Sequence, residues 1–253
     1  MSNATGPHSI RGDMRVLRHL LFHPVRGETH EERLESFYSG QARDYDSFRA
    51  RLLHGRRQLI AKIDFPPDGV WVDMGAGTGE NVLLAGKRAE SLREIHLVDL
   101  SSSLLAIASE RLEDAGINIA RIHLADATRY DAAAASVDLV TFSYSLTMIP
   151  DWFEAIAVAE RILKPGGMIA VTDFYVSRKF SPEEYRQHRW LSRAFWTHWF
   201  AADNVFLSGD HPAFLHRRFD VEVFEERSGK VPYLPLMRAP YYVLIGYKGE
   251  KRC

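Results

Sequence analysis

The sequence predicts an α/β protein built on a doubly wound, mostly parallel sheet. From residue 70 onward, short apolar strands alternate with amphipathic helices, a pattern typical of a parallel sheet with helices on both faces. A glycine-rich turn joins the first strand of this series to its first helix. Hydrophobic residues make up 46% of the 253 residues, which is enough for a sizeable core.

The segment before the first strand is predicted to be helical. Residues 1–12 are polar, contain glycine and proline, and are expected to be disordered. Residues 13–64 are expected to form an N-terminal helical lid or membrane-facing segment. Its helices are predicted at about 14–23, 31–38 and 46–63. The turn residues Pro66, Pro67, Asp68 and Gly69 close this segment.

Residues 65–180 are predicted to form the core of the domain. Its strands are expected at 70–72, 95–99, 117–124, 137–143 and 168–173. Its helices are expected at about 80–89, 101–115 and 151–163, with Ser101 as an N-cap. An aromatic-rich helical insertion is predicted over 181–218. Residues 219–253 are expected to return to the sheet with strands at 221–225 and 241–247.

Composition excludes several classes of protein. The formal net charge of −1 gives no reason to expect a nucleic-acid partner. No apolar run approaches the roughly 20 residues that span a bilayer, and the N-terminus lacks signal-peptide features. Cys253 is the only cysteine, so neither an intrachain disulfide nor a cysteine metal cluster can form. We expect a cytoplasmic protein without a metal site.

The turn after the first strand is a candidate ligand-binding loop. It reads Asp73-Met74-Gly75-Ala76-Gly77-Thr78-Gly79. Glycines let the main chain approach a ligand closely at the edge where open α/β sheets bind. A dinucleotide-binding loop would instead read G-x-G-x-x-G, and here the third glycine comes one residue early. The alternative is a glycine turn that only closes the strand-to-helix junction.

Two acidic residues follow later strands of the predicted sheet. Asp99 ends the next strand, about 20 residues after the loop, where a carboxylate can accept both ribose hydroxyls. Asp126, followed by Ala127, ends the third strand, where an acid can accept from an adenine amino group. Each acid could instead cap the helix that follows it.

Over residues 65–175 the chain resembles the class I S-adenosylmethionine-dependent methyltransferases. The resemblance rests on three features in this order: the loop, the two acids and Leu163-Lys164-Pro165-Gly166-Gly167. The resemblance implies a Rossmann-like, seven-stranded sheet and S-adenosyl-L-methionine as cofactor. It implies that the glycine motif holds the methionine part, Asp99 the ribose and Asp126 the adenine side. The expected cofactor-binding residues are Tyr45, Asp73, Gly75, Ala76, Gly77, Thr78, Gly79, Asp99, Leu100, Asp126, Ala127, Ser143 and Tyr144.

Five blocks outside these motifs resemble the N-methyltransferases of betaine-lipid synthesis over residues 28–248. The blocks are 32–38 with 45–46 and 52–56; Ser143–Trp152; Asp173–Ser177; 195–200 with 203–207; and 231–235 with 240–242. The resemblance implies three methylations of the headgroup amine of diacylglycerylhomoserine, giving diacylglyceryltrimethylhomoserine. It also implies a separate partner enzyme that transfers the aminocarboxypropyl group.

An acceptor that ends as a quaternary ammonium favours an aromatic-lined pocket, because cation–π attraction needs no N–H group. The expected pocket residues are Tyr38, Trp196, Trp199 and Tyr233, and each could instead serve core packing. Tyr144 follows the fourth strand at the ligand edge, and Tyr45 could close over the cofactor as part of the lid.

Methyl transfer is an in-line displacement at a sulfonium, so alignment and a dry site are the main demands. The acceptor amine must lose one proton in each round. His188, His54 or a tyrosine–water path could take that proton, or it could leave to solvent before closure. The expected catalytic residues are Tyr45, Tyr144 and His188. Arg51, Arg56 or Arg57 could hold the acceptor carboxylate.

The basic stretch from Arg11 to Arg26 could lie on an anionic membrane or pack on the domain. A peripheral membrane contact on the inner face is therefore an expectation. The alternative acceptors are phosphatidylethanolamine or a small soluble amine. A third alternative is that the protein is not an enzyme but a regulatory protein that binds the cofactor without catalysis.

Overall fold

A computed structural model describes residues 51–181, 185–202, 204–232 and 234–249. The predicted disordered terminus and most of the predicted lid, including Tyr38 and Tyr45, lie outside these ranges, as does Tyr233. The Arg11–Arg26 stretch also lies outside them. No helix of the described residues is both long enough and apolar enough to cross a bilayer.

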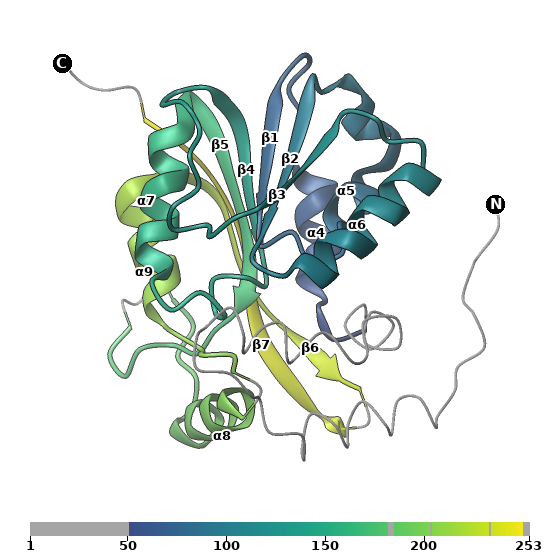
Figure 1. The fold of residues 1–253 in the computed structure, drawn as a ribbon. Helices are drawn as coiled ribbons and strands as arrows, with labels where there is room; N and C mark the ends of the chain where they lie inside the picture. The colour runs from purple at the N-terminus through teal and green to yellow at the C-terminus, as the bar shows by residue number, and fades with distance from the viewer. Residues whose placement is uncertain (1–50, 182–184, 203, 233, 250–253) are drawn as a thin grey trace.

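A seven-stranded sheet forms the centre of the molecule, in the order β3-β2-β1-β4-β5-β7-β6 (Figure 1). The strands are β1 (Val70–Met74), β2 (Glu94–Asp99), β3 (Ala120–Leu124), β4 (Val137–Ser143), β5 (Leu163–Phe174), β6 (Asp220–Val231) and β7 (Leu234–Tyr247). The first five strands pair in parallel, and β7 pairs antiparallel with both β5 and β6. The predicted doubly wound, mostly parallel sheet is confirmed.

Helices cover both faces of the sheet (Figure 1). α4 (Gly55–Lys62), α5 (Glu80–Ala85) and α6 (Ser102–Asp114) lie on one face, and α7 (Trp152–Ile162) and α9 (Asp210–Arg218) on the other. Two buried apolar clusters fill the layers between sheet and helices. All five residues of β1 are buried, because both faces of a central parallel strand are covered.

Two helix boundaries follow local backbone chemistry. Ser101 caps α6 as predicted, its Oγ accepting from Leu104 N at 3.3 Å. The helix predicted to run to residue 89 instead ends as α5 at Ala85. Gly86 has a φ of 51°, and the chain continues as the 3₁₀ helix η1 (Gly86–Ser91).

The C-terminal strands are much longer than the predicted 221–225 and 241–247. β6 and β7 pair from Asp220 with Tyr247 to Val231 with Leu234, and they extend beyond the carboxyl ends of the parallel strands (Figure 1). The predicted insertion contains α8 (Trp190–Ala201) and α9. α8 lies beyond the same end of the sheet.

Candidate active site

A cavity lies at the carboxyl ends of the parallel strands, the edge where open α/β sheets bind ligands. Its lining comes from the glycine loop, the end of β2, the segment after β3 and the segment between β4 and α7. The lining residues are Gly75, Gly77, Val98, Asp99, Leu100, Leu104, Ala125, Asp126, Ala127, Thr128, Tyr144, Ser145, Met148, Ile149, Pro150 and Asp151.

The glycine loop is fixed against β2 by its own backbone. Gly75 N and Ala76 N both donate to Val98 O, at 2.8 and 3.1 Å. Gly75 has a φ of 72°, and a Cβ there would lie 2.4 Å from Ser145 Cβ. Gly77 has a φ of 56°, and a Cβ there would meet nothing within 4 Å. Glycine at this position therefore leaves room for a ligand in the cavity.

Asp99 connects the glycine loop to the helix after β2. Its Oδ2 accepts from Gly77 N at 2.8 Å and its Oδ1 from Ser101 N at 2.9 Å. Asp99 also lines the cavity, and a carboxylate can accept several hydrogen bonds. Asp99 therefore fits both expected roles, shaping the loop and facing the cavity.

Asp126 also lines the cavity, after β3, and the preceding residue Ala125 donates through its N–H to Asp99 O at 3.0 Å. Its Oδ1 accepts from Thr128 N at 2.8 Å, which fixes the turn that carries Asp126, Ala127 and Thr128. The expected position beside a purine is consistent with the apolar side chains nearby, Leu100, Leu104 and Ala127.

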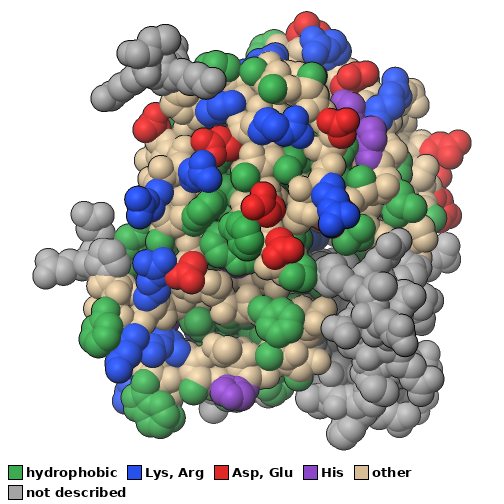
Figure 2. All heavy atoms as spheres, turned by 60° about the vertical axis from the view of Figure 1, so that its left-hand side comes forward, with side chains coloured by type: hydrophobic (Ala, Val, Ile, Leu, Met, Phe, Trp, Pro, Cys, Tyr) green, Lys and Arg blue, Asp and Glu red, His purple; other side chains and the backbone are tan. Residues whose placement is uncertain are grey.

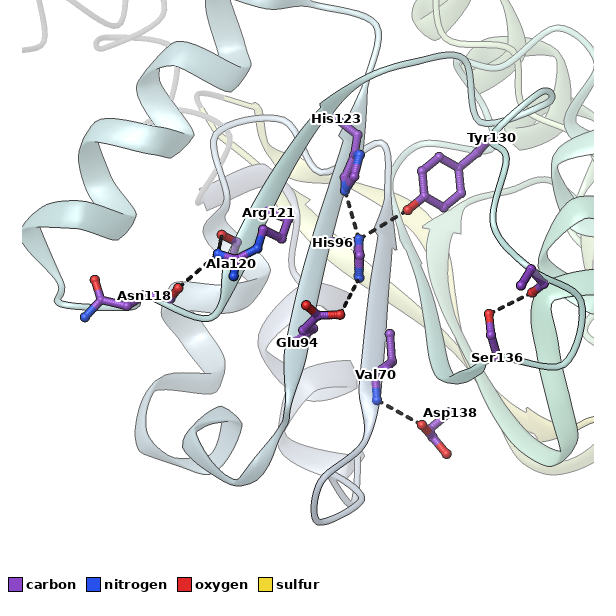
Figure 3. Close-up of polar contacts among 11 residues, drawn as sticks. Val70, Glu94, His96, Asn118, Ala120, Arg121, His123, Tyr130, Ser136 and Asp138 are labelled. Carbon is purple, nitrogen blue, oxygen red and sulfur yellow. Dashed lines mark hydrogen bonds and ion pairs between the residues drawn. The ribbon is translucent and has the colours of Figure 1, made fainter.

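A histidine pair supports the chain that follows this turn (Figure 3). His96 Nδ1 on β2 lies 2.8 Å from His123 Nε2 on β3, and the rings stack with centroids 5.0 Å apart. Tyr130 Oη lies 3.3 Å from His96 Nδ1. Burial and the neighbouring His96 lower the pKa of His123. The cluster attaches the segment after Asp126 to β2 and to the edge strand β3, and it was not among the site residues predicted from the sequence.

Asp73 is buried beneath the glycine loop and outside the cavity lining. Its oxygens accept from Asn81 Nδ2 at 2.9 and 3.0 Å and from Thr141 Oγ1 at 2.5 Å. Burial raises the pKa of Asp73 to about 6, although these hydrogen bonds and the charge of Arg56 oppose the shift. Asp73 therefore shapes the loop from below.

Ser143, at the end of β4, is held by an arginine from α4. Arg56 Nε donates to Ser143 Oγ at 3.0 Å. This bond places Arg56 beside the end of β4, and Arg56 is one of the three arginines proposed from the sequence. Arg57 is exposed and Arg51 is half-buried.

Three further residues of the predicted motif lie behind the cavity lining. Ala76 and Thr78 are buried, and Thr78 O and Oγ1 accept from Arg111 Nη1 at 3.1 and 2.9 Å. Gly79 begins α5 with a φ of 73°, and a Cβ there would lie 3.3 Å from Leu97. These residues fix the turn, and their expected contact with the cofactor stays a prediction.

Tyr144 lines the cavity and joins it to an aromatic cluster. Its ring lies 4.6 Å from that of Phe174, and Phe174 lies 4.5 Å from Phe200. Its φ is 56°, an uncommon conformation for a non-glycine residue. Burial raises the pKa of Tyr144 far above its ordinary value, so the hydroxyl keeps its proton at neutral pH. Tyr144 therefore shapes the site, and its expected catalytic role stays a prediction.

Asp173, which the site prediction did not include, fixes the segment between β4 and α7. It is fully buried and accepts from Thr147 Oγ1 at 2.7 Å, Thr147 N at 3.1 Å and Phe174 N at 2.8 Å. Burial raises the pKa of Asp173 to about 7. Its place at the end of a central strand was the signal available in the sequence.

Of the other expected catalytic and pocket residues, those that the structure describes are not among the cavity lining. His188 Nδ1 accepts from Ser177 N at 3.0 Å, and its ring contacts Tyr175. These contacts fix the segment before α8. His54 Nε2 lies 2.8 Å from Lys230 O, and it holds the β6–β7 hairpin. Neither histidine is among the described residues that line the cavity, so the expected role of a histidine base stays a prediction.

The two pocket tryptophans are packing residues of α8. Trp196 is buried and contacts Phe200, through which it reaches Phe174 and Tyr144. Trp199 stacks on Phe195, with ring centroids 5.6 Å apart. Helix α8 buries one face, which includes Trp196, against the domain. Neither tryptophan is among the described residues that line the cavity, and their expected contact with the acceptor stays a prediction.

The described cavity residues fit S-adenosylmethionine. The lining includes Asp99, Asp126 and Asp151 but no lysine, arginine or histidine, which suits a ligand with a positive sulfonium and ammonium group. Gly77 leaves open space beside Asp99. When bound there, the cofactor supplies a methyl group that is open to in-line displacement. The chain's own residues supply alignment and exclude water.

Comparisons with known proteins give the same assignment. Residues 72–171 match the family model described as a methyltransferase domain. Over 171 residues the chain is 28% identical to the ubiquinone/menaquinone biosynthesis C-methyltransferase UbiE of Cupriavidus necator, covering 66% of this chain and 69% of that protein. The UbiE protein of Ralstonia nicotianae is 27% identical over 171 residues, again covering 66% of this chain and 69% of that protein.

Solved structures share the fold at low identity. The YcgJ protein of Bacillus subtilis superposes with a TM-score of 0.63 at 16% identity, covering 78% of this chain and 99% of that chain. A phosphoethanolamine N-methyltransferase 2 of Haemonchus contortus was solved with phosphomonomethylethanolamine and S-adenosylhomocysteine. It superposes with a TM-score of 0.64 at 18% identity, covering 85% of this chain and 60% of that chain. With the matched domain, the cavity and this fold, the chain is an S-adenosylmethionine-dependent methyltransferase of the class I fold.

Proposed function

We propose that the enzyme methylates the headgroup amine of diacylglycerylhomoserine three times to give the betaine lipid. This proposal rests on one observation. The described sequence blocks that resemble betaine-lipid N-methyltransferases are joined to one another by hydrogen bonds. Gly55 N donates to Tyr144 Oη at 3.0 Å, and Thr147 Oγ1 donates to Asp173. Phe206 N donates to Thr147 O at 2.8 Å. Segments far apart in the sequence are thus built around the Tyr144 side of the cavity.

The charge and aromatic character of this side support an amine acceptor. Tyr144 presents an aromatic ring at the lining, and three aspartates supply the charge of the described wall. An acidic, aromatic site suits a substrate that becomes permanently cationic. The phosphoethanolamine N-methyltransferase 2 of Haemonchus contortus, solved with phosphomonomethylethanolamine, has a similar fold.

The acceptor amine must lose a proton in each round. The described cavity lining holds no histidine or lysine, and Tyr144 keeps its proton. We therefore propose that the proton leaves to solvent before the acceptor is enclosed, without a dedicated base. Arg56, beside Ser143, is the candidate partner for the acceptor carboxylate.

Incubation of the purified protein with methyl-labelled cofactor tests the proposal. Detergent-dispersed diacylglycerylhomoserine should give mono-, di- and trimethyl products in sequence. Phosphatidylethanolamine and ethanolamine serve as parallel acceptors. Labelling of phosphatidylethanolamine or ethanolamine, with none of diacylglycerylhomoserine, would overturn the assignment of diacylglycerylhomoserine as the acceptor. No transfer to any amine would overturn N-methylation.

A second candidate is methylation of carbon on a quinone ring. The similarity to the ubiquinone/menaquinone biosynthesis C-methyltransferases of Cupriavidus and Ralstonia favours this candidate. A demethylated menaquinone precursor is the discriminating acceptor. Transfer of label to this ring, with none to the lipid amine, would replace the proposed function by this one.

A further inference from the structure

We propose that the outward face of α8 and its flanking segments dock the enzyme on an anionic lipid surface. This inference rests on the proposed function, because a diacyl acceptor stays in a bilayer. The docking surface is defined here by five exposed apolar side chains. They are Phe180, Trp190, Leu191, Phe195 and Phe206, with exposed fractions of 81%, 70%, 56%, 38% and 57%.

The helix is apolar on both sides. Its inward side buries Trp196 and Phe200 against the domain. Its outward side presents Trp190, Leu191 and Phe195 to solvent. A surface helix ordinarily places charged or polar residues opposite its buried stripe. An apolar outward face of this size marks an interaction surface.

The charge around the docking surface identifies its partner. From Tyr185 to Ala202 the chain contains Arg186, Arg189 and Arg193 but no aspartate or glutamate. Arg178, which forms an ion pair with Asp210 at 2.6 Å, and Lys179 precede this stretch. Lys179 Nζ lies 5.3 Å from the centroid of the Phe180 ring. Exposed apolar side chains interspersed with lysine and arginine are visible at the lower end of the molecule in Figure 2. Tryptophan and arginine together on an exposed helix are typical of membrane interfaces.

The surface lies beside the active site. Helix α8 is beyond the carboxyl ends of the parallel strands, where the cavity opens (Figure 1). Phe206 is bonded through its backbone to Thr147, in the segment between β4 and α7. Phe200, on the inward side of α8, contacts Phe174, which contacts Tyr144. Docking by this surface would therefore bring the Tyr144 side of the cavity near lipid headgroups.

Vesicle flotation tests the inference without any methyl donor or acceptor. The vesicles contain equal phosphatidylglycerol and phosphatidylcholine, with pure phosphatidylcholine for comparison. The double variant Trp190→Ser/Leu191→Ser should lose at least about tenfold in partition to the anionic vesicles. The matched control is Ile122→Ser, which removes a 38% exposed apolar side chain from edge strand β3 and should bind as the wild type does.

A second variant tests the charge contribution. Arg189→Gln/Arg193→Gln should reduce binding to the anionic vesicles by about tenfold, with little effect on pure phosphatidylcholine. Thermal unfolding of each variant checks that the fold is kept. Equal vesicle binding by wild type and both double variants would overturn the inference. So would self-association that the Trp190→Ser/Leu191→Ser change abolishes while vesicle binding stays unchanged, because the surface would then pair with a second copy.

The outcome is separable from that of the proposed function. Loss of vesicle binding in the variants would support the docking surface even if the lipid amine were never methylated. Methylation of detergent-dispersed acceptor with unaltered vesicle binding would retain the function and remove the docking surface.

Discussion

Gly55 N donates to Tyr144 Oη at 3.0 Å, joining the first turn of α4 to the residue that follows β4. Both groups are buried, and 89 positions separate them in the sequence. The bond holds the Tyr144 ring at the cavity while its proton stays in place. It makes the start of α4 part of the active site.

Replacing Tyr144 separates the roles of its hydroxyl and its ring. Tyr144→Phe leaves Gly55 N without this acceptor, and the free energy of unfolding should fall by about 1–3 kcal/mol. Because the ring remains, kcat/KM for the lipid amine should change little. Tyr144→Leu removes the ring, and the loss of about 2 kcal/mol of cation–π attraction should lower kcat/KM about 30-fold. Equal activity of the two variants would argue against a ring contact with the acceptor.

Gly77→Ala tests the cavity beside the glycine loop. The new Cβ meets no protein atom within 4 Å, but it enters the space assigned to the cofactor. The Kd for S-adenosylhomocysteine, measured by calorimetry, should rise at least about tenfold. The matched control is Gly116→Ala, since Gly116 also has a positive φ, at 71°, and open space but lies outside the cavity lining. Both variants should lose about 1 kcal/mol of stability from backbone strain, and only Gly77→Ala should lose affinity.

Gly55→Ala should destabilise the domain by overpacking. A Cβ there would lie 2.1 Å from Thr172 Oγ1 and 2.9 Å from Tyr241 Cδ2. Overpacking costs about 1–3 kcal/mol, which exceeds the gain of about 1 kcal/mol in helix propensity. A denaturant-based double-mutant cycle with Thr172→Ala should show a coupling energy of at least 0.5 kcal/mol in magnitude, roughly the lower bound for touching residues. Independent, additive effects would contradict this packing.

His211 should make stability depend on pH. It is fully buried against Trp152, with ring centroids 4.7 Å apart, and burial lowers its pKa to about 4. The unfolded chain binds this proton near pH 6.5, so the His211 contribution is full above that pH. It is lost as pH falls from 6.5 toward 4.

His211→Phe keeps a ring against Trp152 and removes this titration. Relative to wild type, the variant should gain about 2 kcal/mol of stability when the pH is lowered from 8 to 5. Urea unfolding at the two pH values measures the difference. Because Asp73 and Asp173 titrate in both proteins, they cancel in the comparison. A stability difference that does not change with pH would show that His211 is not the group responsible.

The parallel part of the fold was predictable because each strand and helix there has a local signal. Val70-Trp71-Val72 is an apolar run before glycines, and Ser101 is a cap before an amphipathic helix. β3 begins at Ala120 instead of Ile117, since Gly116 has a φ of 71° and Ile117 N returns to Leu112 O. The hydrophobic pattern of the sequence gives no sign of this turn at the end of α6, so the start of β3 was predicted three residues early.

The long hairpin could not be predicted, because tertiary pairing overrides composition there. Residues such as Glu226, Ser228 and Gly229 in β6, and Pro240 in β7, have low strand propensity. They are nevertheless paired, Ser228 lying opposite Pro240. β6 is an edge strand and needs hydrogen bonds on one side only.

The site was partly predictable. Glycine spacing and strand-end acids located Gly75, Gly77, Asp99 and Asp126 at the cavity, since the carboxyl ends of parallel strands meet at one edge. The orientation of α8 was not encoded locally. Trp196 and Trp190 are both tryptophans on one helix, yet one is buried and the other exposed. Only the packing of α8 on Phe174 distinguishes them.

The strand order has a consequence for how the protein is made on the ribosome. β7 lies between β5 and β6, although it follows both in the sequence. The five parallel strands can pair in the order of their synthesis or soon after, but β6 has no neighbour in the sheet until residues 234–247 emerge. Until then one edge of β5 is open to intermolecular pairing. Aggregation of nascent chains should therefore be greatest while β5 and β6 have emerged from the ribosome and residues 234–247 have not.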